Sequence, residues 1–253
     1  MKKIDICFVS VGDAASGKNA LVDIVKKIKK AFSEKGMELS YTEIEYSEEC
    51  RSKIRDGSLP VILLSENISS ENIFKINELI KSFDAYSESY PLVYLGELSN
   101  PQLRDEVSEL YLPSKVFSDP DYLRIEFISR LEQLSCETEE DDSAFCGIFG
   151  NVFLELGMCF RDSGRLDSAE LSYQMAESDA IIIKDVDPML SRYLMYQSSK
   201  NLGIIYLKDG RNKEAREKLS VALDMLMSLA GKRGAETIKE LELLKTLLFG
   251  LTE

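Results

Sequence analysis

The chain has 253 residues, of which 44% are hydrophobic and 30% are charged, and its formal net charge is −13. This composition is typical of a soluble globular protein with one large or two small domains, and the acidity disfavours nucleic acid as the main partner. The apolar runs are shorter than a membrane span and the N-terminus lacks the pattern of a secretory signal, so we expect a cytoplasmic protein without membrane contacts.

The sequence contains no histidine, which limits the chemistry that its side chains can perform. Without imidazole, a Ser-His or Cys-His nucleophile cannot be assembled. The five scattered cysteines lack the CxxC spacing of a zinc site, so we predict no metal and expect buried, reduced thiols. Any general acid or base must therefore be Asp, Glu, Lys, Tyr or Cys.

Up to about residue 135, short apolar runs alternate with amphipathic helical patterns. The predicted strands are 3–10, 38–44, 60–65, 91–96 and 114–118, and the predicted helices are 18–36, 47–57, 71–83, 101–110 and 119–134. Five β-α units in this order predict an α/β domain with a flavodoxin-like five-stranded parallel sheet and helices on both faces. Ligands of such sheets bind beyond the carboxyl ends of the strands, where we expect the loops after Ser10, Ile44, Ser65 and Gly96.

A run of acidic residues separates this region from the rest of the chain. The segment 137-ETEEDD-142 has five acids in six residues and is unsuited to packing. We therefore predict a linker at residues 136–143, between a domain at 1–135 and a second domain at 144–253.

Two stretches of the second domain, residues 153–180 and 199–225, share one spacing pattern. The matched positions are Leu156-Gly157, Phe160, Gly164, Ala169, Tyr173 and Ala176 in the first copy, and Leu202-Gly203, Tyr206, Gly210, Ala215, Leu219 and Ala222 in the second. This pattern resembles the tetratricopeptide (TPR) repeat, in which small residues let two antiparallel helices approach and glycine ends the first helix.

The copies lie 46 residues apart, and we expect the excess around 184–197 to lengthen the first helix of the second copy. A last amphipathic helix at 235–250 would cover the open end of the stack. The resemblance implies an all-α domain whose concave surface binds a protein partner or whose helices pair two copies of the chain.

The first domain carries an ordered set of short motifs. The strand and loop 4-IDICFVSVGD-13 precede a helix that ends at Lys35-Gly36, and 54-IRDGSLPVILLSEN-67 precedes a helix with an acid at Glu78. This order resembles the Toll/interleukin-1 receptor (TIR) domain over residues 1–135. The tryptophan of that family is absent: Phe74 lies in its region, and Ile76-Asn77 replaces the Trp-Cys pair before the acid.

Many TIR domains cleave NAD⁺ at the nicotinamide–ribose bond, whereas others only assemble. The resemblance implies that Glu78 is the catalytic carboxylate and stabilises an oxocarbenium-like ribose. NAD⁺ would then be a substrate, and no bound cofactor is expected. The residues that would line the site are Ser10, Gly12, Asp13, Ser65 and Phe74, and 45-EYSEEC-50 would be a mobile loop that gates the site and mediates self-association.

The first loop also allows a different interpretation. The stretch 12-GDAASGKN-19 reads as GxxxxGK, with Asn where a P-loop has the Ser or Thr that binds magnesium. Lys18 can still meet a substrate phosphate at the start of the following helix.

Glu78 and the residues predicted near it also have simpler interpretations. Glu78 can be an exposed helix acid paired with Lys75 or Lys81, Phe74 can belong to the core, and Ser65 with Asn67 can shape a turn.

Three functions therefore stay open. The first is an NAD⁺-cleaving enzyme regulated by self-association or partner sensing through the helical domain, which by domain pairing fits immune or antiphage signalling. The second is a non-catalytic adaptor that makes only protein contacts, and the third is a nucleotide-binding regulator that uses residues 12–19.

Overall fold

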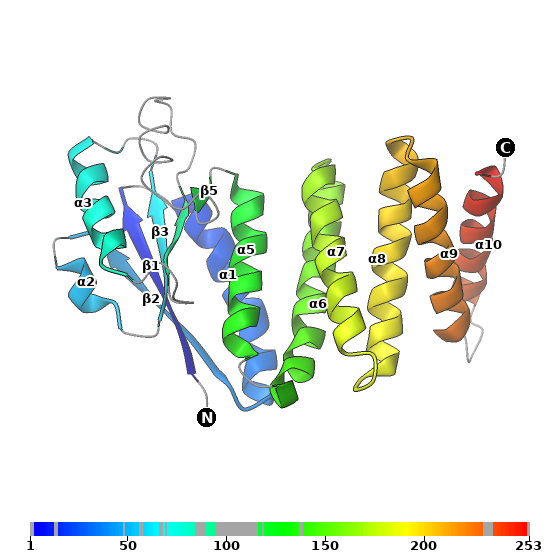
Figure 1. The fold of residues 1–253 in the computed structure, drawn as a ribbon, viewed down its shortest axis with the longest axis horizontal. Coiled ribbons are helices and arrows are strands. Elements are labelled where there is room, and N and C mark those ends of the chain that lie inside the picture. The colour runs from blue at the N-terminus through cyan, green and yellow to red at the C-terminus, as the bar shows by residue number, and fades with distance from the viewer. Residues whose placement is uncertain are drawn as a thin grey trace. The chain divides into compact units, whose positions relative to one another are not determined.

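In this computed structural model the described residues are 3–12, 15–47, 49–55, 58–65, 68, 70–83, 90–94, 116–117, 119–136, 139–229 and 235–251. Contacts divide the chain into two compact units, residues 1–135 and 136–253, which are described separately (Figure 1). The predicted helix 101–110 and the predicted site residue Asp13 lie outside the described residues, as do Asn67 and Gly96.

The first unit contains a parallel sheet. Its strands are β1 (Lys3–Val11), β2 (Glu38–Glu45), β3 (Leu59–Leu64), β4 (Leu92–Tyr94) and the short β5 (Val116–Phe117). They pair in the order β2-β1-β3-β4-β5, and each pair is parallel. The predicted mixed α/β class with a parallel sheet is confirmed. The strand order reverses between β1 and β3, because β2 lies on one side of β1 and all later strands lie on the other.

Helices cover both faces of this sheet, as predicted (Figure 1). Successive side chains of a strand point to opposite faces. Along β1, Cys7, Val9 and Val11 join a buried cluster with residues of α2 (Cys50–Lys53) and α3 (Ser70–Lys81). On the other face, the ring of Phe8 lies 6.1 Å from that of Phe127, between centroids. Phe127 belongs to α5 (Pro120–Ser135), which packs beside α1 (Ala15–Glu34).

The second unit consists of helices in the part that the structure describes. They are α6 (Glu139–Asp162), α7 (Leu166–Ile182), α8 (Pro188–Lys208), α9 (Asn212–Leu229) and α10 (Ala235–Gly250). The pairs α6–α7 and α8–α9 contain the two sequence copies, and α10 packs on α9 around Leu226 and Leu244. Glu139 begins α6, so this helix includes the part of the predicted linker 136–143 from residue 139 onward. Acidic residues are stabilising in the first turn of a helix, where the helix dipole is positive.

The repeated glycines allow close contact within each helix pair. A Cβ at Gly157 would lie 2.7 Å from the ring of Tyr173, and a Cβ at Gly203 would lie 2.6 Å from Cγ of Leu219. Both distances are shorter than a van der Waals contact. The two copies therefore use one packing rule, in which a glycine on the first helix receives a large side chain from the second.

The turns that close the two pairs are equivalent as well. Gly164 and Gly210 adopt left-handed φ angles of 76° and 73°. The following residues, Arg165 and Arg211, donate their backbone N–H groups to carbonyls at the end of the preceding helix, at 2.9 and 2.8 Å. This is the Schellman arrangement, which satisfies the last carbonyls of a helix.

Candidate functional site

The carboxyl ends of β1 and β3 meet where the strand order reverses. Val11 pairs with Leu64, and the N–H of Ser65 donates to the carbonyl of Val11 at 3.0 Å. Gly12 has a φ of 73°, and a Cβ there would collide with Oγ of Ser65. Both facts require glycine at this position. The structure thus brings Ser10, Gly12 and Ser65 to one edge of the sheet.

The end of β4 and the start of α1 complete this edge. Gly17 is buried in the first turn of α1, and a Cβ there would lie 3.0 Å from the ring of Tyr94 at the end of β4. The first turn of α1 contains no acidic residue. The backbone N–H groups at the start of this helix and the helix dipole therefore favour an anion.

The same helix does not support the P-loop interpretation. A P-loop uses a glycine-rich loop before its helix to surround phosphates. Here α1 begins at Ala15, so Gly17 and Lys18 are already helical. Nζ of Lys18 forms an ion pair with Oε2 of Glu43 on β2, at 2.7 Å. Gly17 is explained by its packing on Tyr94, and Lys18 by its pairing with the neighbouring strand.

The segment 45–50, predicted to gate the site, is tied to the sheet at both ends. Glu45 ends β2, and the N–H of Tyr46 donates to the carbonyl of Ser10 at 2.9 Å. Cys50 begins α2 and is buried. Whatever role the segment has, it starts directly beside the end of β1.

Glu78 and Phe74 lie one turn apart on an exposed face of α3. Phe74 is 66% exposed, so the alternative that it belongs to the core is wrong. The side chain of Glu78 is 56% exposed and accepts from Nζ of Lys81 at 3.0 Å. Lys75, the other predicted partner, pairs instead with Glu71, also at 3.0 Å.

The predicted site residues therefore form two groups. Ser10, Gly12 and Ser65 share the edge of the sheet, whereas Phe74 and Glu78 share a face of the helix that follows β3. Glu78 lies about 12 Å along the axis from the start of α3, given a rise of about 1.5 Å per residue.

Sequence reasoning missed a hollow of about 260 Å³ in the first unit. It lies over β2 and the amino-terminal ends of β1 and β3, and is lined by Asp5, Thr42, Ile44, Lys53, Arg55 and Ser58. Burial raises the pKa of Asp5. The hydrogen bond from Ser40 and the charges of Lys3 and Arg55 together lower it by more than burial raises it, so the pKa of Asp5 lies below its ordinary value. The hollow thus holds one ionised carboxylate, that of Asp5, and two basic side chains, those of Lys53 and Arg55.

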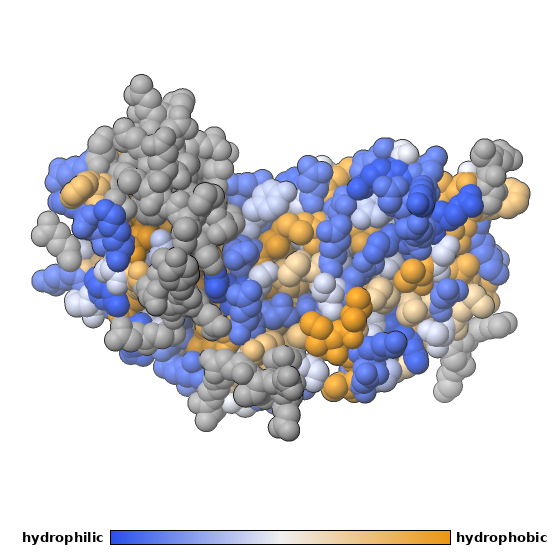
Figure 2. Space-filling view, in the orientation of Figure 1, coloured by the Kyte–Doolittle hydropathy of each residue, from blue (hydrophilic) through white to orange (hydrophobic). Residues whose placement is uncertain are grey.

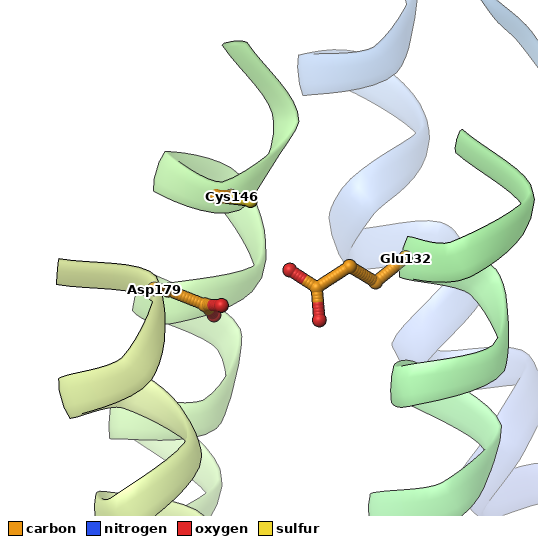
Figure 3. Close-up of side chains that lie close together, drawn as sticks. All are labelled: Glu132, Cys146 and Asp179. Atoms are coloured by element: carbon orange, nitrogen blue, oxygen red, sulfur yellow. The ribbon is translucent and has the colours of Figure 1, made fainter. Parts of the chain in front are cut away.

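Figure 3 shows the side chains of Glu132, Cys146 and Asp179, each of which carries a possible metal-ligating atom. Cys146 of α6 and Asp179 of α7 belong to the second unit, whereas Glu132 of α5 belongs to the first. Because the two units are not placed relative to one another, the three residues do not define one site.

The cysteines are free thiols. Cys7, Cys50 and Cys146 are buried as predicted, but Cys136 is half-buried and Cys159 is exposed. Burial raises the pKa of the Cys7 and Cys50 thiols, which makes both poor nucleophiles.

The chain matches no protein-family model and no curated protein. Among solved structures it is similar to the crystal structure of BtubC (BKLC) from P. vanneervenii, with 14% sequence identity over 72% of this chain and 76% of that chain, and a TM-score of 0.31. At this TM-score the likeness carries no argument about function. Within the described ranges, no helix is long and apolar enough to cross a membrane.

Proposed function

We propose that the first unit is a flavodoxin-like domain similar to TIR domains, and that it cleaves NAD⁺ at the nicotinamide–ribose bond in the cytoplasm. The exposed pair of Phe74 and Glu78 on α3 carries this proposal. An aromatic ring one helical turn from a carboxylate offers a stacking surface for a base beside a negative charge for a sugar.

The chemistry requires little more than this carboxylate. The C–N bond to the ribose breaks, its electron pair returns to the pyridinium ring, and nicotinamide leaves as a neutral molecule. Positive charge then grows on the ribose, where the carboxylate of Glu78 stabilises it. Water or another hydroxyl adds to the ribose and releases a proton to solvent, so no histidine is needed.

The edge near Ser10, Gly12 and Ser65 suits the diphosphate of the same ligand. It adjoins the start of α1, whose first turn lacks acidic residues. A diphosphate there would accept hydrogen bonds from backbone N–H groups. Lys18 is held by Glu43 and is left out of this proposed site.

For the second unit we propose a TPR-like role in regulation. Its repeated glycine contacts form a helix stack that is suited to binding a protein or another copy of the chain. An enzyme of this kind that is switched by assembly fits immune or antiphage signalling.

Nicotinamide release by the purified full chain tests this proposal. We expect release that rises faster than the protein concentration, and a loss of about 100-fold in Glu78→Ala, which is the scale for removing one electrostatic catalytic group. Release that is unchanged in Glu78→Ala would remove the site assignment.

A second candidate is an adaptor without catalysis. The observation that favours it is the ion pair between Glu78 and Lys81, because exposed helices commonly carry such pairs without further function. If the full chain released no nicotinamide at any protein concentration, the result would favour the adaptor over the enzyme.

A further inference from the structure

The hollow at Asp5 lies on the face of the sheet that packs against α2. Along β1, Cys7 and Val9 join the buried cluster on this face, and they pair in register with Thr42 and Ile44 of β2. The segment from the end of α2 to the start of β3 forms another wall of the hollow. We call this cavity the Asp5 hollow, and its lining residues are Asp5, Thr42, Ile44, Lys53, Arg55 and Ser58.

The volume of the Asp5 hollow limits what can bind there. It measures about 260 Å³, below the roughly 300–1,000 Å³ of pockets for drug-sized ligands. Ser58 is buried, and its hydroxyl donates to the carbonyl of Arg55 at 2.5 Å, which holds the connection before β3 in a turn. Ile44 supplies an apolar wall, because it packs against the buried cluster beside α2. The surface around α2 is mainly hydrophilic (Figure 2), so the hollow suits a small molecule with one apolar part and polar groups.

The carboxylate of Asp5 supplies the negative charge in the hollow. The side chain of Asp5 is 24% exposed and accepts a hydrogen bond from the hydroxyl of Ser40. Nζ of Lys3 lies 3.5 Å from one carboxylate oxygen, and Nη1 of Arg55 lies 3.4 Å from the other. Charge-assisted hydrogen bonds are commonly about 2.7–2.9 Å long, so neither cation makes a close bond. The carboxylate can therefore accept a closer donor from a ligand.

Two basic side chains supply the opposite charge. The side chain of Arg55 is 69% exposed, and its pair with Asp5 is the long one at 3.4 Å. Lys53 is exposed and forms no ion pair with the residues that the structure describes. A guanidinium and an ammonium group together suit a carboxylate, because arginine donates to both carboxylate oxygens and lysine adds a third donor. Lys53 and Arg55 can therefore bind the carboxylate of a ligand.

A ligand that carries both charges suits this hollow best. A phosphate or a dicarboxylate would meet the like charge of Asp5, and a simple amine would meet Lys53 and Arg55. A neutral ligand would give none of these charges a new partner. A small molecule with an ammonium and a carboxylate group pairs with both kinds of side chain, and this choice does not depend on the sum of the charges. An α-amino acid carries both groups on one carbon atom.

We propose that the Asp5 hollow binds a free aliphatic α-amino acid. Asp5 receives the ammonium group of the ligand, and Lys53 and Arg55 receive its carboxylate. The aliphatic side chain of the ligand packs on Ile44. The hollow lies at the amino-terminal ends of β1 and β3, whereas the proposed NAD⁺ site uses their carboxyl ends, so the two ligands do not compete for one site. The proposal is therefore independent of NAD⁺ cleavage.

Methyl NMR of the isoleucines in the full chain, without NAD⁺, tests the proposal. L-leucine is added up to about 20 mM, which covers binding as weak as millimolar. We expect the methyl signal of Ile44 to shift to saturation, while that of Ile28, which is buried on α1, stays in place. Two analogues of leucine each lack one charged group: 3-methylbutylamine has no carboxylate and 4-methylpentanoate has no ammonium. Each should bind at least about tenfold more weakly than leucine, because it leaves a charge of the hollow without its partner.

Single substitutions give a second readout. Asp5→Asn and Arg55→Gln each remove one charge and should weaken leucine binding at least about tenfold, with the Ile28 signal reporting an intact fold. Asp23→Asn is the matched control, because Asp23 also lies 3.5 Å from a lysine but is on α1, outside the hollow, and should leave binding unchanged. The proposal is overturned by an Ile44 signal that leucine does not move, by an analogue that binds as tightly as leucine, or by equal loss in Asp23→Asn and Asp5→Asn.

Discussion

The two helix pairs of the second unit place different side chains at equivalent positions. The large residue over the glycine is Tyr173 in the first pair and Leu219 in the second, and both are completely buried. The hydroxyl of Tyr173 has no hydrogen-bond partner among the described residues. The repeat therefore preserves the contact between a glycine of the first helix and a large side chain of the second. The type of large side chain can change, but a tyrosine there buries a hydroxyl without a hydrogen bond.

The aromatic position on the first helix shows the opposite case. Phe160 in the first pair has no polar atom to satisfy, whereas the hydroxyl of Tyr206 in the second pair donates to Oε1 of Glu170 at 3.1 Å. Glu170 also pairs with Arg211, whose guanidinium lies 3.8 Å from the centroid of the Tyr206 ring. A hydroxyl at this position reaches the seam between the two pairs and is satisfied there.

Truncating the two large residues should give the largest effects on stability. We expect Tyr173→Ala to lower the free energy of unfolding by about 4 kcal/mol and Leu219→Ala by about 3 kcal/mol, because each leaves a cavity opposite a glycine. Urea unfolding measures both. A loss below about 1 kcal/mol for either variant would show that the contact over the glycine is not equivalent in the two pairs.

Alkaline pH should affect Tyr173 more strongly than Tyr206, although burial raises the pKa of both tyrosines. Burial raises the pKa of Tyr173 from 10.0 to about 12. In the unfolded chain Tyr173 ionises near pH 10. Its contribution to the free energy of unfolding is therefore complete below pH 10 and is lost as the pH rises through 12. The loss is on the order of 2 kcal/mol.

The measurement is the free energy of unfolding of wild type, Tyr173→Phe and Tyr206→Phe across this range. We expect Tyr173→Phe to remove this part of the alkaline loss while changing stability little at neutral pH, since the hydroxyl has no partner to lose. Tyr206→Phe should keep the pH dependence of Tyr173 and cost about 1 kcal/mol through its lost hydrogen bond. Identical profiles for both variants would contradict the comparison.

Substitutions in the turns of the two pairs should lower the free energy of unfolding equally, and by less than the substitutions above. Gly164→Ala and Gly210→Ala each force a Cβ into the left-handed region, although the space around both glycines is open. We expect a loss of about 1 kcal/mol in each case, seen as a shift of the urea midpoint. Asparagine, which tolerates this region better, should cost less at both positions. A clear difference between the two turns would mean that they are not equivalent.

The helix pairs were predictable because their determinants are local. The spacing of Gly157, Gly164 and Tyr173 specifies one pair, and the same offsets specify the other. The start of α6 at Glu139 is not encoded as clearly, because a run of acidic residues is typical of linkers as well as of helix starts. Four acids at residues 139–142 are instead compatible with the first turn of a helix.

The candidate site was only partly predictable. The meeting of Gly12 with Ser65 follows from the order of the strands, but the exposure of Phe74 follows from the buried stripe of α3 formed by Ile76, Leu79 and Ile80. Phe74 lies opposite that stripe, a signal that the sequence contained. The hollow at Asp5 depends on the register that places Ser40 beside it, and no local pattern encodes this register.

The most direct test of the account compares two carboxylates on one helix. Glu71 and Glu78 are both exposed on α3, and each pairs with a lysine at 3.0 Å, Lys75 and Lys81 respectively. The two side chains carry the same charge, are 77% and 56% exposed and each have a lysine partner, so the main difference between them is their position on the helix. Nicotinamide release from NAD⁺ should fall about 100-fold in Glu78→Gln and stay at the wild-type rate in Glu71→Gln. Equal rates in the two variants would contradict the assignment of Glu78 as the catalytic carboxylate.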